Sequence, residues 1–212
     1  MTLSRLAGIG SIALALIYIV GFVYFGGYWA YPATGAIDEK INYLNNNQLG
    51  YTLVYLTIYV VFGVVLAVVV AGVHEVLDAA KNKVMLVASM FGVIWVGMVI
   101  TAGMIGTMGL DVVLNVALND PKNAINIWEI VALITQSIGG GNELVGGLWA
   151  LLLSIAALRN HSFTKPLNYL GCLVGLIGIA TVYPAEVLTM VFGLSQIVWF
   201  VWLGFVMFKS IS

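Results

Sequence analysis

One carboxyl group lies where a hydrophobic helix is predicted. Glu143, preceded by Asn142, stands sixteen residues before Arg159, which marks the cytoplasmic boundary of the predicted helix. That distance is about 24 Å at 1.5 Å per residue, which leaves Glu143 about 6 Å inside the outer edge of a hydrocarbon core about 30 Å thick. Ionisable side chains at such depths usually face the bundle interior or a wet cavity. Glu143 is therefore a candidate for a proton-linked or polar-ligand site, with hydrogen bonding between helices as the alternative.

Other polar side chains could share a pocket with Glu143 in the outer half of the bundle. Gln136 precedes Glu143 by one heptad and lies on the same face if the helix is continuous. Gln196 and Thr101 fall within two other predicted spans. Each of these groups could be satisfied by a single hydrogen bond, so only their combination indicates a site. We predict a ligand-binding set of Glu143, Asn142, Gln136, Gln196 and Thr101.

Three consecutive glycines, Gly139, Gly140 and Gly141, precede this carboxyl group. Together they cost a helix on the order of 3 kcal/mol relative to alanines. A hinge, kink or unwound segment would explain them, and close helix packing would explain them equally well. For the first of these explanations we expect helical hydrogen bonding to break or bend between residues 138 and 142.

Several chemistries are disfavoured by the residues present. Cys172 is the only cysteine, which excludes an internal disulfide and a multi-cysteine metal site. The two histidines, His74 and His161, both fall at the predicted cytoplasmic boundary, where they do not suggest a haem or metal site. Hydrolase signatures are absent, so an intramembrane enzyme is the least favoured class. We expect no cofactor, no metal and no nucleic-acid partner, because no basic patch exists beyond short loops.

The elements that must position these residues are membrane helices. Hydrophobic residues make up 62% of the 212 residues and charged residues only 8%, far below the charged fraction of about 25% typical of soluble domains. Six of the eight lysines and arginines fall at one set of helix ends, a positive-inside bias that places both termini in the cytoplasm. We predict an all-α single domain over 1–212, with six spans at about 8–30, 51–73, 84–108, 140–158, 166–184 and 187–208.

The predicted outer side carries two further features. Ile37, Ile41 and Leu44 share one face of a short helix that we expect to lie on the membrane surface. The apolar pattern of the third span continues to residue 118, and Asp120 and Pro121 can cap and open the next helix, which predicts a long helical hairpin outside the membrane. Aromatic residues gather at the outer helix ends, and we interpret them as interfacial anchors, with a ligand cage as the alternative; they are Tyr24, Tyr28, Trp29, Tyr31, Tyr51, Tyr55 and Tyr59.

Glycine spacing marks two packing faces. Gly171 and Gly175, with Gly178 beyond them, give the fifth span a flat stripe for close backbone approach. Gly103, Gly106 and Gly109 do the same for the third span. These motifs indicate packing and carry no chemistry of their own.

Short apolar motifs along the whole chain support a family resemblance. They are Arg5-x-Ala7-Gly8, the helix from Asp38 to Asn47, Leu148-Trp149, Pro166 followed by Leu170-Gly171, and Trp199-x-x-Trp202-Leu203-Gly204. The chain resembles a six-helix bacterial membrane protein family known only as a domain of unknown function. The resemblance implies a fold, a bacterial origin and a membrane location, and no functional residues.

From these residues we expect a multi-pass protein of the bacterial inner membrane. Its outer half, near Glu143, would form a pocket that binds or transports a lipid or small amphipathic molecule. The alternative is a non-catalytic accessory or assembly subunit that packs against another membrane protein. A cavity around Glu143 would favour the first hypothesis, and helices closed over it would favour the second.

Overall fold

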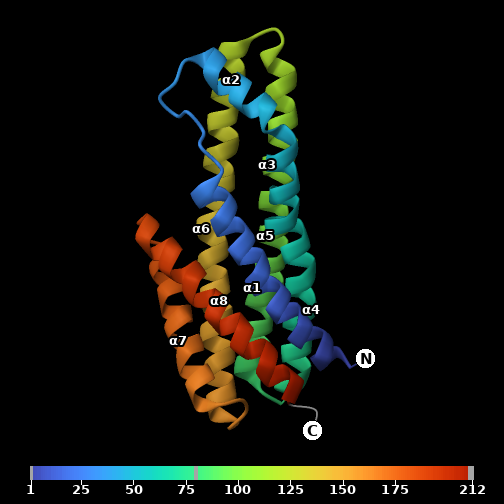
Figure 1. Ribbon diagram of the computed structural model, residues 1–212. Helices are drawn as coiled ribbons and strands as arrows, with labels where there is room; N and C mark the ends of the chain where they lie inside the picture. Colours follow the sequence, from blue (N-terminus) through green and yellow to red (C-terminus); the bar gives the residue numbers. More distant parts are fainter. Residues whose placement is uncertain (1, 79–80, 210–212) are drawn as a thin grey trace.

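The computed structural model describes residues 2–78 and 81–209, and this part of the chain contains helices and no strands (Figure 1). The chain alternates up and down through a bundle, with a short cap at one end. In order, the elements are α1 (Leu3–Gly27), α2 (Ile37–Asn46), α3 (Gln48–Tyr55), the π-helical turn η1 (Leu56–Val61), α4 (Phe62–Val76), α5 (Lys83–Ala117), α6 (Pro121–Arg159), α7 (Lys165–Ala180) and α8 (Glu186–Lys209).

Five helical segments in the described part are long and apolar enough to cross a membrane. They are Leu3–Gly27, Gln48–Val76, Lys83–Ala117, Pro121–Arg159 and Glu186–Phe208. The remaining apolar helix, α7, has 16 residues and is about 24 Å long, short of the roughly 30 Å of a hydrocarbon core. The protein is thus helical with several candidate transmembrane segments. In Figure 1, α1 begins and α8 ends at the same end of the bundle.

Helices α5 and α6 form the long hairpin predicted from the sequence. The side chain of Asn82 caps α5 by accepting hydrogen bonds from the backbone N–H groups of Val84 and Met85. Asp120 caps α6 by accepting from the N–H of Asn123 at 3.1 Å, and Pro121 opens that helix. With 35 and 39 residues the helices are about 52 and 58 Å long, so the hairpin extends beyond α1, α7 and α8 (Figure 1).

No break interrupts α6 at its three glycines. The helix runs without interruption from Pro121 to Arg159, so the unwound segment expected at Gly139, Gly140 and Gly141 is not present. Packing of α6 against α5 and α7 stabilises the helix on both sides of the glycines and offsets their low helix propensity. A methyl group added at Gly139 would meet nothing within 4 Å, while one at Gly141 would meet the Met98 side chain. A hinge at these glycines stays a prediction about motion.

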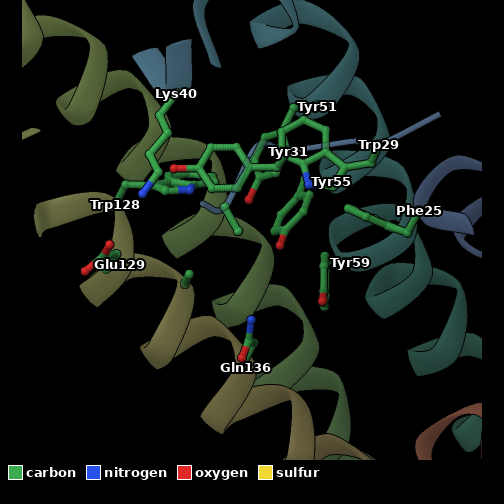
Figure 2. Close-up of a pocket in the computed structure, with 12 residues that line it drawn as sticks. Phe25, Trp29, Tyr31, Lys40, Tyr51, Tyr55, Tyr59, Trp128, Glu129 and Gln136 are labelled. Atoms are coloured by element: carbon green, nitrogen blue, oxygen red, sulfur yellow. The ribbon is translucent and has the colours of Figure 1, made fainter. Parts of the chain in front are cut away.

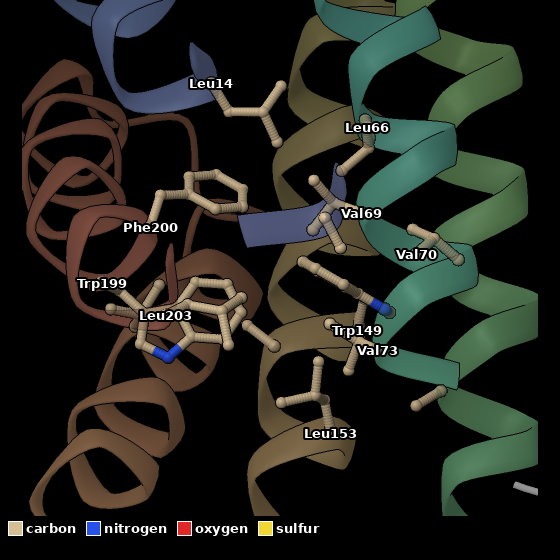
Figure 3. Close-up of a cluster of buried hydrophobic side chains, with 14 of the residues drawn as sticks. Leu14, Leu66, Val69, Val70, Val73, Trp149, Leu153, Trp199, Phe200 and Leu203 are labelled. Atoms are coloured by element: carbon tan, nitrogen blue, oxygen red, sulfur yellow. The ribbon is translucent and has the colours of Figure 1, made fainter. Parts of the chain in front are cut away.

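Elsewhere, glycines let helices touch at their backbones, as their spacing predicted. A methyl group added at Gly147 on α6 would lie 2.8 Å from the Cα atom of Gly178 and 2.9 Å from the carbonyl oxygen of Gly175, both on α7. Gly8 on α1 and Gly204 on α8 meet in the same way. Between these contacts lies a core of large side chains, including Trp149, Trp199 and Phe200 (Figure 3).

Helix α2 forms where it was predicted, but protein covers part of its apolar face, since Leu44 is buried while Ile37 is 38% exposed. Leu44 is fully buried in a second cluster with Tyr51, Leu110, Val113, Ala124 and Trp128. The helix therefore packs across the ends of α5 and α6 near residues 117–124, and Leu44 faces protein there. The reason is that the long hairpin offers an apolar surface well outside the short helices, which local sequence cannot show.

Candidate ligand cavity

A cavity in the described part of the chain lies where α1 ends and the longer helices continue. Its volume is 540 Å³, within the usual range for small-molecule sites. Aromatic side chains from α1, the loop that follows it, α3, η1 and α6 form most of its wall (Figure 2). The lining residues are Phe25, Trp29, Tyr31, Ala33, Lys40, Tyr51, Tyr55, Tyr59, Trp128, Glu129, Ala132 and Gln136.

The cavity wall forms where the loop after α1 packs against α3 and α6. After α1 ends at Gly27, the loop places Trp29 against Tyr51, with ring centroids 5.0 Å apart. The hydroxyl group of Tyr43 on α2 accepts a hydrogen bond from the backbone N–H of Ala30 at 2.7 Å, which fixes the loop. Trp128 on α6 forms the opposite side of the cavity wall, and its ring centroid lies 5.6 Å from that of Tyr51.

Most of the aromatic residues interpreted as interfacial anchors turn inward instead. Tyr51 is only 3% exposed, and Trp29, Tyr31, Tyr55 and Tyr59 also line the cavity. Tyr28, at 74% exposed, has the position that an interfacial anchor requires. The cage alternative therefore describes this region better, because α2 and the α5–α6 hairpin enclose side chains that would otherwise face headgroups.

Polar groups enter this aromatic wall at a few points. Lys40 brings an amine from α2, and Glu129 and Gln136 bring a carboxylate and an amide from α6 (Figure 2). Burial raises the pKa of the Tyr31 hydroxyl group, and the nearby Glu129 carboxylate raises it further. The cavity thus offers π faces, hydroxyl groups and one charge of each sign, a surface suited to a molecule with both apolar and polar parts.

Among the predicted site residues, Gln136 lines the cavity and Glu143 does not. Glu143 is half-buried further along α6, where its Oε2 accepts a hydrogen bond from Thr189 Oγ1 on α8 at 3.1 Å. The hydroxyl group of Thr181, just after α7, donates to the carbonyl oxygen of Gly178 at 2.6 Å. The Glu143 carboxyl group therefore faces α8 through its bond to Thr189, as a site or a cross-helix tie would require.

The other predicted residues are not gathered into one pocket. Thr101 is exposed on α5 and donates to the carbonyl oxygen of Gly97 at 2.8 Å. Gln196 is fully buried in the core face of α8, and within the described residues neither its Oε1 nor its Nε2 has a partner. Asn142 is buried with its Oδ1 equally unpartnered. The pocket expected around Glu143 stays a prediction, and the aromatic cavity is a different one that lies nearer the Pro121 end of α6 and shares only Gln136 with the predicted set.

Sequence reasoning kept the aromatic cage only as an alternative and did not place Phe25, Trp128, Lys40 or Glu129 at the site. One signal was available, since Tyr51, Tyr55 and Tyr59 recur every fourth residue and must share a helical face. In residues 2–78 and 81–209, no three His, Cys, Asp or Glu side chains lie together in a way that could hold a metal ion. His74 hydrogen-bonds to Ser89 Oγ through its Nδ1 atom at 2.8 Å.

Comparisons with protein-family models, with curated proteins and with solved structures found no match to this chain. The resemblance drawn from short motifs therefore stays a prediction.

Proposed function

We propose that this chain is a membrane protein of the bacterial cytoplasmic membrane that binds a lipid or another small amphipathic molecule in the aromatic cavity. The observation that carries this proposal is the cavity's wall, which combines seven aromatic side chains with Lys40, Glu129 and Gln136. Aromatic side chains with a polar tip suit the boundary between hydrocarbon and water. A ligand with an apolar body and a polar head would satisfy both kinds of surface.

The position of the cavity along the bundle supports an amphipathic ligand. Phe25 and Trp29 line the cavity at the end of α1, while α5 and α6 exceed a hydrocarbon core by more than 20 Å. The neighbouring face of α6 exposes Ile130, Leu133 and Ile134, within the stretch between Glu129 and Gln136. A polar head could therefore occupy the cavity while an acyl chain lies along the exposed apolar face.

Binding can be tested with a lysophosphatidylcholine that carries bromine atoms close to the glycerol end of its chain. Bromine quenches tryptophan fluorescence on contact, and Trp29 and Trp128 lie in the cavity wall. We expect saturable quenching at about one probe per chain, as for a single formed pocket. Ala132→Phe and Ala33→Phe, which fill the cavity from two elements, should abolish the saturable component.

A matched control separates cavity binding from contact with bulk lipid. Leu173→Phe adds a ring to an exposed position on α7, away from the cavity lining, and should leave saturable quenching intact. If both filled variants still bind the probe as the wild type does, the cavity is not the site. If the wild type shows no saturable quenching, the accessory-subunit hypothesis becomes the better one.

We further propose six spans with both termini in the cytoplasm. Six of eight basic residues support this orientation, since cytoplasmic loops are enriched in Lys and Arg. The proposal takes α7 as the sixth crossing despite its 16 residues, and locally thinned bilayer or flanking polar residues accommodate such short helices.

A further inference from the structure

Four aromatic rings in the cavity wall contact one another in a closed circuit. They come from the loop after α1, from α3 and from α6, and all four line the cavity (Figure 2). The ring centroid of Tyr31 lies 6.4 Å from that of Trp29 and 6.1 Å from that of Trp128. The ring centroid of Tyr51 lies 5.0 Å from that of Trp29 and 5.6 Å from that of Trp128. These four residues form an aromatic cage.

The dimensions of the aromatic cage suit a cation. The face of an aromatic ring carries negative partial charge and attracts an ammonium group within about 6 Å of its centroid. The four separations place the midpoint between the Trp29 and Trp128 centroids within about 6 Å of all four centroids. An ammonium group at the centre of the cage would therefore interact with every ring.

Two opposite charges line the same cavity and are not paired with each other. Lys40 extends from α2, and Glu129 stands on α6 (Figure 2). In residues 2–78 and 81–209 the one salt bridge joins Lys81 and Asp78. The Lys40 ammonium group and the Glu129 carboxylate therefore remain available to the opposite charges of a ligand.

The position of Lys40 separates it from the other charges of α2. Asp38 and Glu39 are exposed, whereas Lys40 is half-buried and lines the cavity. Lysines are mostly exposed in proteins, and a partly buried charge gains when a ligand of opposite charge pairs with it. Packing of the aromatic rings explains the cage, but it does not explain why an amine lies beside them.

A ligand head with a single charge would use only one of these features. An anionic head would pair with Lys40, but Glu129 would repel it and the ring faces would not attract it. A cationic head would use the cage and Glu129, but Lys40 would repel it. A head with both charges can pair with both residues, because they belong to different elements of the wall.

We propose that the cavity selects phospholipids whose head carries both a phosphate and an ammonium group. The ammonium group lies in the aromatic cage, where Glu129 also attracts it, and the phosphate pairs with Lys40. The acyl chain lies along the exposed apolar face of α6. This inference rests on the proposed function, because it specifies which class of lipid the cavity binds.

Competition against the brominated lysophosphatidylcholine probe measures this selectivity. The competitors share one acyl chain and differ in the head: lysophosphatidylcholine, lysophosphatidylethanolamine and lysophosphatidylglycerol. We expect the first two to displace the probe at similar concentrations, because both carry an ammonium group. Lysophosphatidylglycerol, which lacks one, should require about tenfold more. Equal displacement by all three competitors would overturn the selectivity and leave the proposed ligand binding in place.

Charge-neutral variants assign each charge to its part of the head. Glu129→Gln should weaken lysophosphatidylcholine and strengthen lysophosphatidylglycerol, so that the preference falls below about threefold. Lys40→Gln should weaken both lipids, because both contain a phosphate. If Glu129→Gln keeps the tenfold preference, Glu129 does not face the ammonium group and the proposal is wrong.

Two matched controls change the same charges outside the cavity lining. Asp111→Asn on α5 and Lys122→Gln on α6 alter exposed side chains. Their affinities for all three competitors should equal those of the wild type. A loss of preference in Asp111→Asn as large as that in Glu129→Gln would show that net charge, and not the cavity, sets the selectivity.

Tyr31 allows the ring to be tested apart from its hydroxyl group. Tyr31→Phe keeps the ring face and should keep the preference for an ammonium head. Tyr31→Leu removes the face and should weaken lysophosphatidylcholine about threefold or more while lysophosphatidylglycerol still binds, which shows that the cavity is intact. If Tyr31→Phe loses the preference as Tyr31→Leu does, the hydroxyl group and not the ring selects the head, and the cage is wrong.

Free phosphocholine tests whether the ligand is a lipid or a soluble molecule. It carries the same two charges without an acyl chain, so it should displace the probe only at concentrations about a hundredfold or more above those of lysophosphatidylcholine. Displacement at equal concentrations would overturn the lipid in favour of a soluble zwitterion. If the wild type shows no saturable quenching by the probe, the proposed function itself fails, and the selectivity fails with it.

Discussion

Two glycines on one helix allow the packing of α6 to be measured against its helix propensity. At Gly147 a methyl group would lie 2.8 Å from the Cα atom of Gly178, about 0.6 Å short of the 3.4 Å at which ordinary contact begins. At Gly139 it would meet nothing within 4 Å. Gly147→Ala therefore forces α7 away from α6, whereas Gly139→Ala changes only the conformational preference of the backbone.

The expected difference follows from these distances. The atoms opposite Gly147 belong to the backbone of α7 and cannot rotate aside, so the cost falls in the upper part of the 1–3 kcal/mol range typical of overpacking. The gain in helix propensity returns up to about 1 kcal/mol. We expect Gly147→Ala to lower the free energy of unfolding by about 1–2 kcal/mol and Gly139→Ala to raise it by up to about 1 kcal/mol.

Titration with SDS in mixed micelles would measure both unfolding free energies under the same conditions. The two variants should differ by about 1–3 kcal/mol, with the wild type between them. A Gly147→Ala protein as stable as the wild type would show that α6 and α7 do not approach at their backbones. A destabilised Gly139→Ala protein would show that the helix is not regular at the three glycines. That result would support a hinge at this position.

Two further predictions concern orientation and pH. Phosphatase fused after Leu44 or near Lys122 should be active and fused after Asp78 or Ser162 inactive, and an active fusion at the C-terminus would contradict an even number of spans. Burial and Glu129 raise the pKa of Tyr31, so the folded chain keeps this proton where the unfolded chain releases it. The stability it contributes is complete below the ordinary tyrosine pKa of about 10 and is lost as the pH rises through the raised value. Between about pH 9 and pH 11 the unfolding free energy of Tyr31→Phe should therefore fall less steeply than that of the wild type, and equal slopes would refute the assignment.

Local patterns predicted most of the helices, but not the continuity of α6 through its three glycines. The caps at Asn82 and Asp120, the proline at the start of α6 and the extension of α5 to Ala117 all depend on residues within one or two turns of each other. The same holds for the glycine stripe of α7, where Gly175 and Gly178 at helical spacing predicted a face for close backbone approach. Composition alone indicated a membrane protein, because so few charges cannot cover a soluble surface.

The site could be predicted only in fragments. Glu143 was recognisable as the one carboxyl group within a predicted span, and it does face a hydroxyl group of another helix, that of Thr189 on α8. Thr101 was expected beside it, yet it faces outward on α5. The position of a polar residue within an apolar helix indicates how deep in the membrane its side chain lies. The direction of that side chain depends on which neighbours surround the helix.

By itself, the sequence determined which segments are helices, where they begin and which faces carry glycine, because these properties depend on neighbouring residues. Only the tertiary structure decided that residues near 25, 40, 55 and 130 enclose one cavity, since those segments meet only after α2 folds back over the hairpin. It also decided that Gly147 touches another helix while Gly139 touches nothing. Both glycines have the same local preference, and the position of α7 makes the difference.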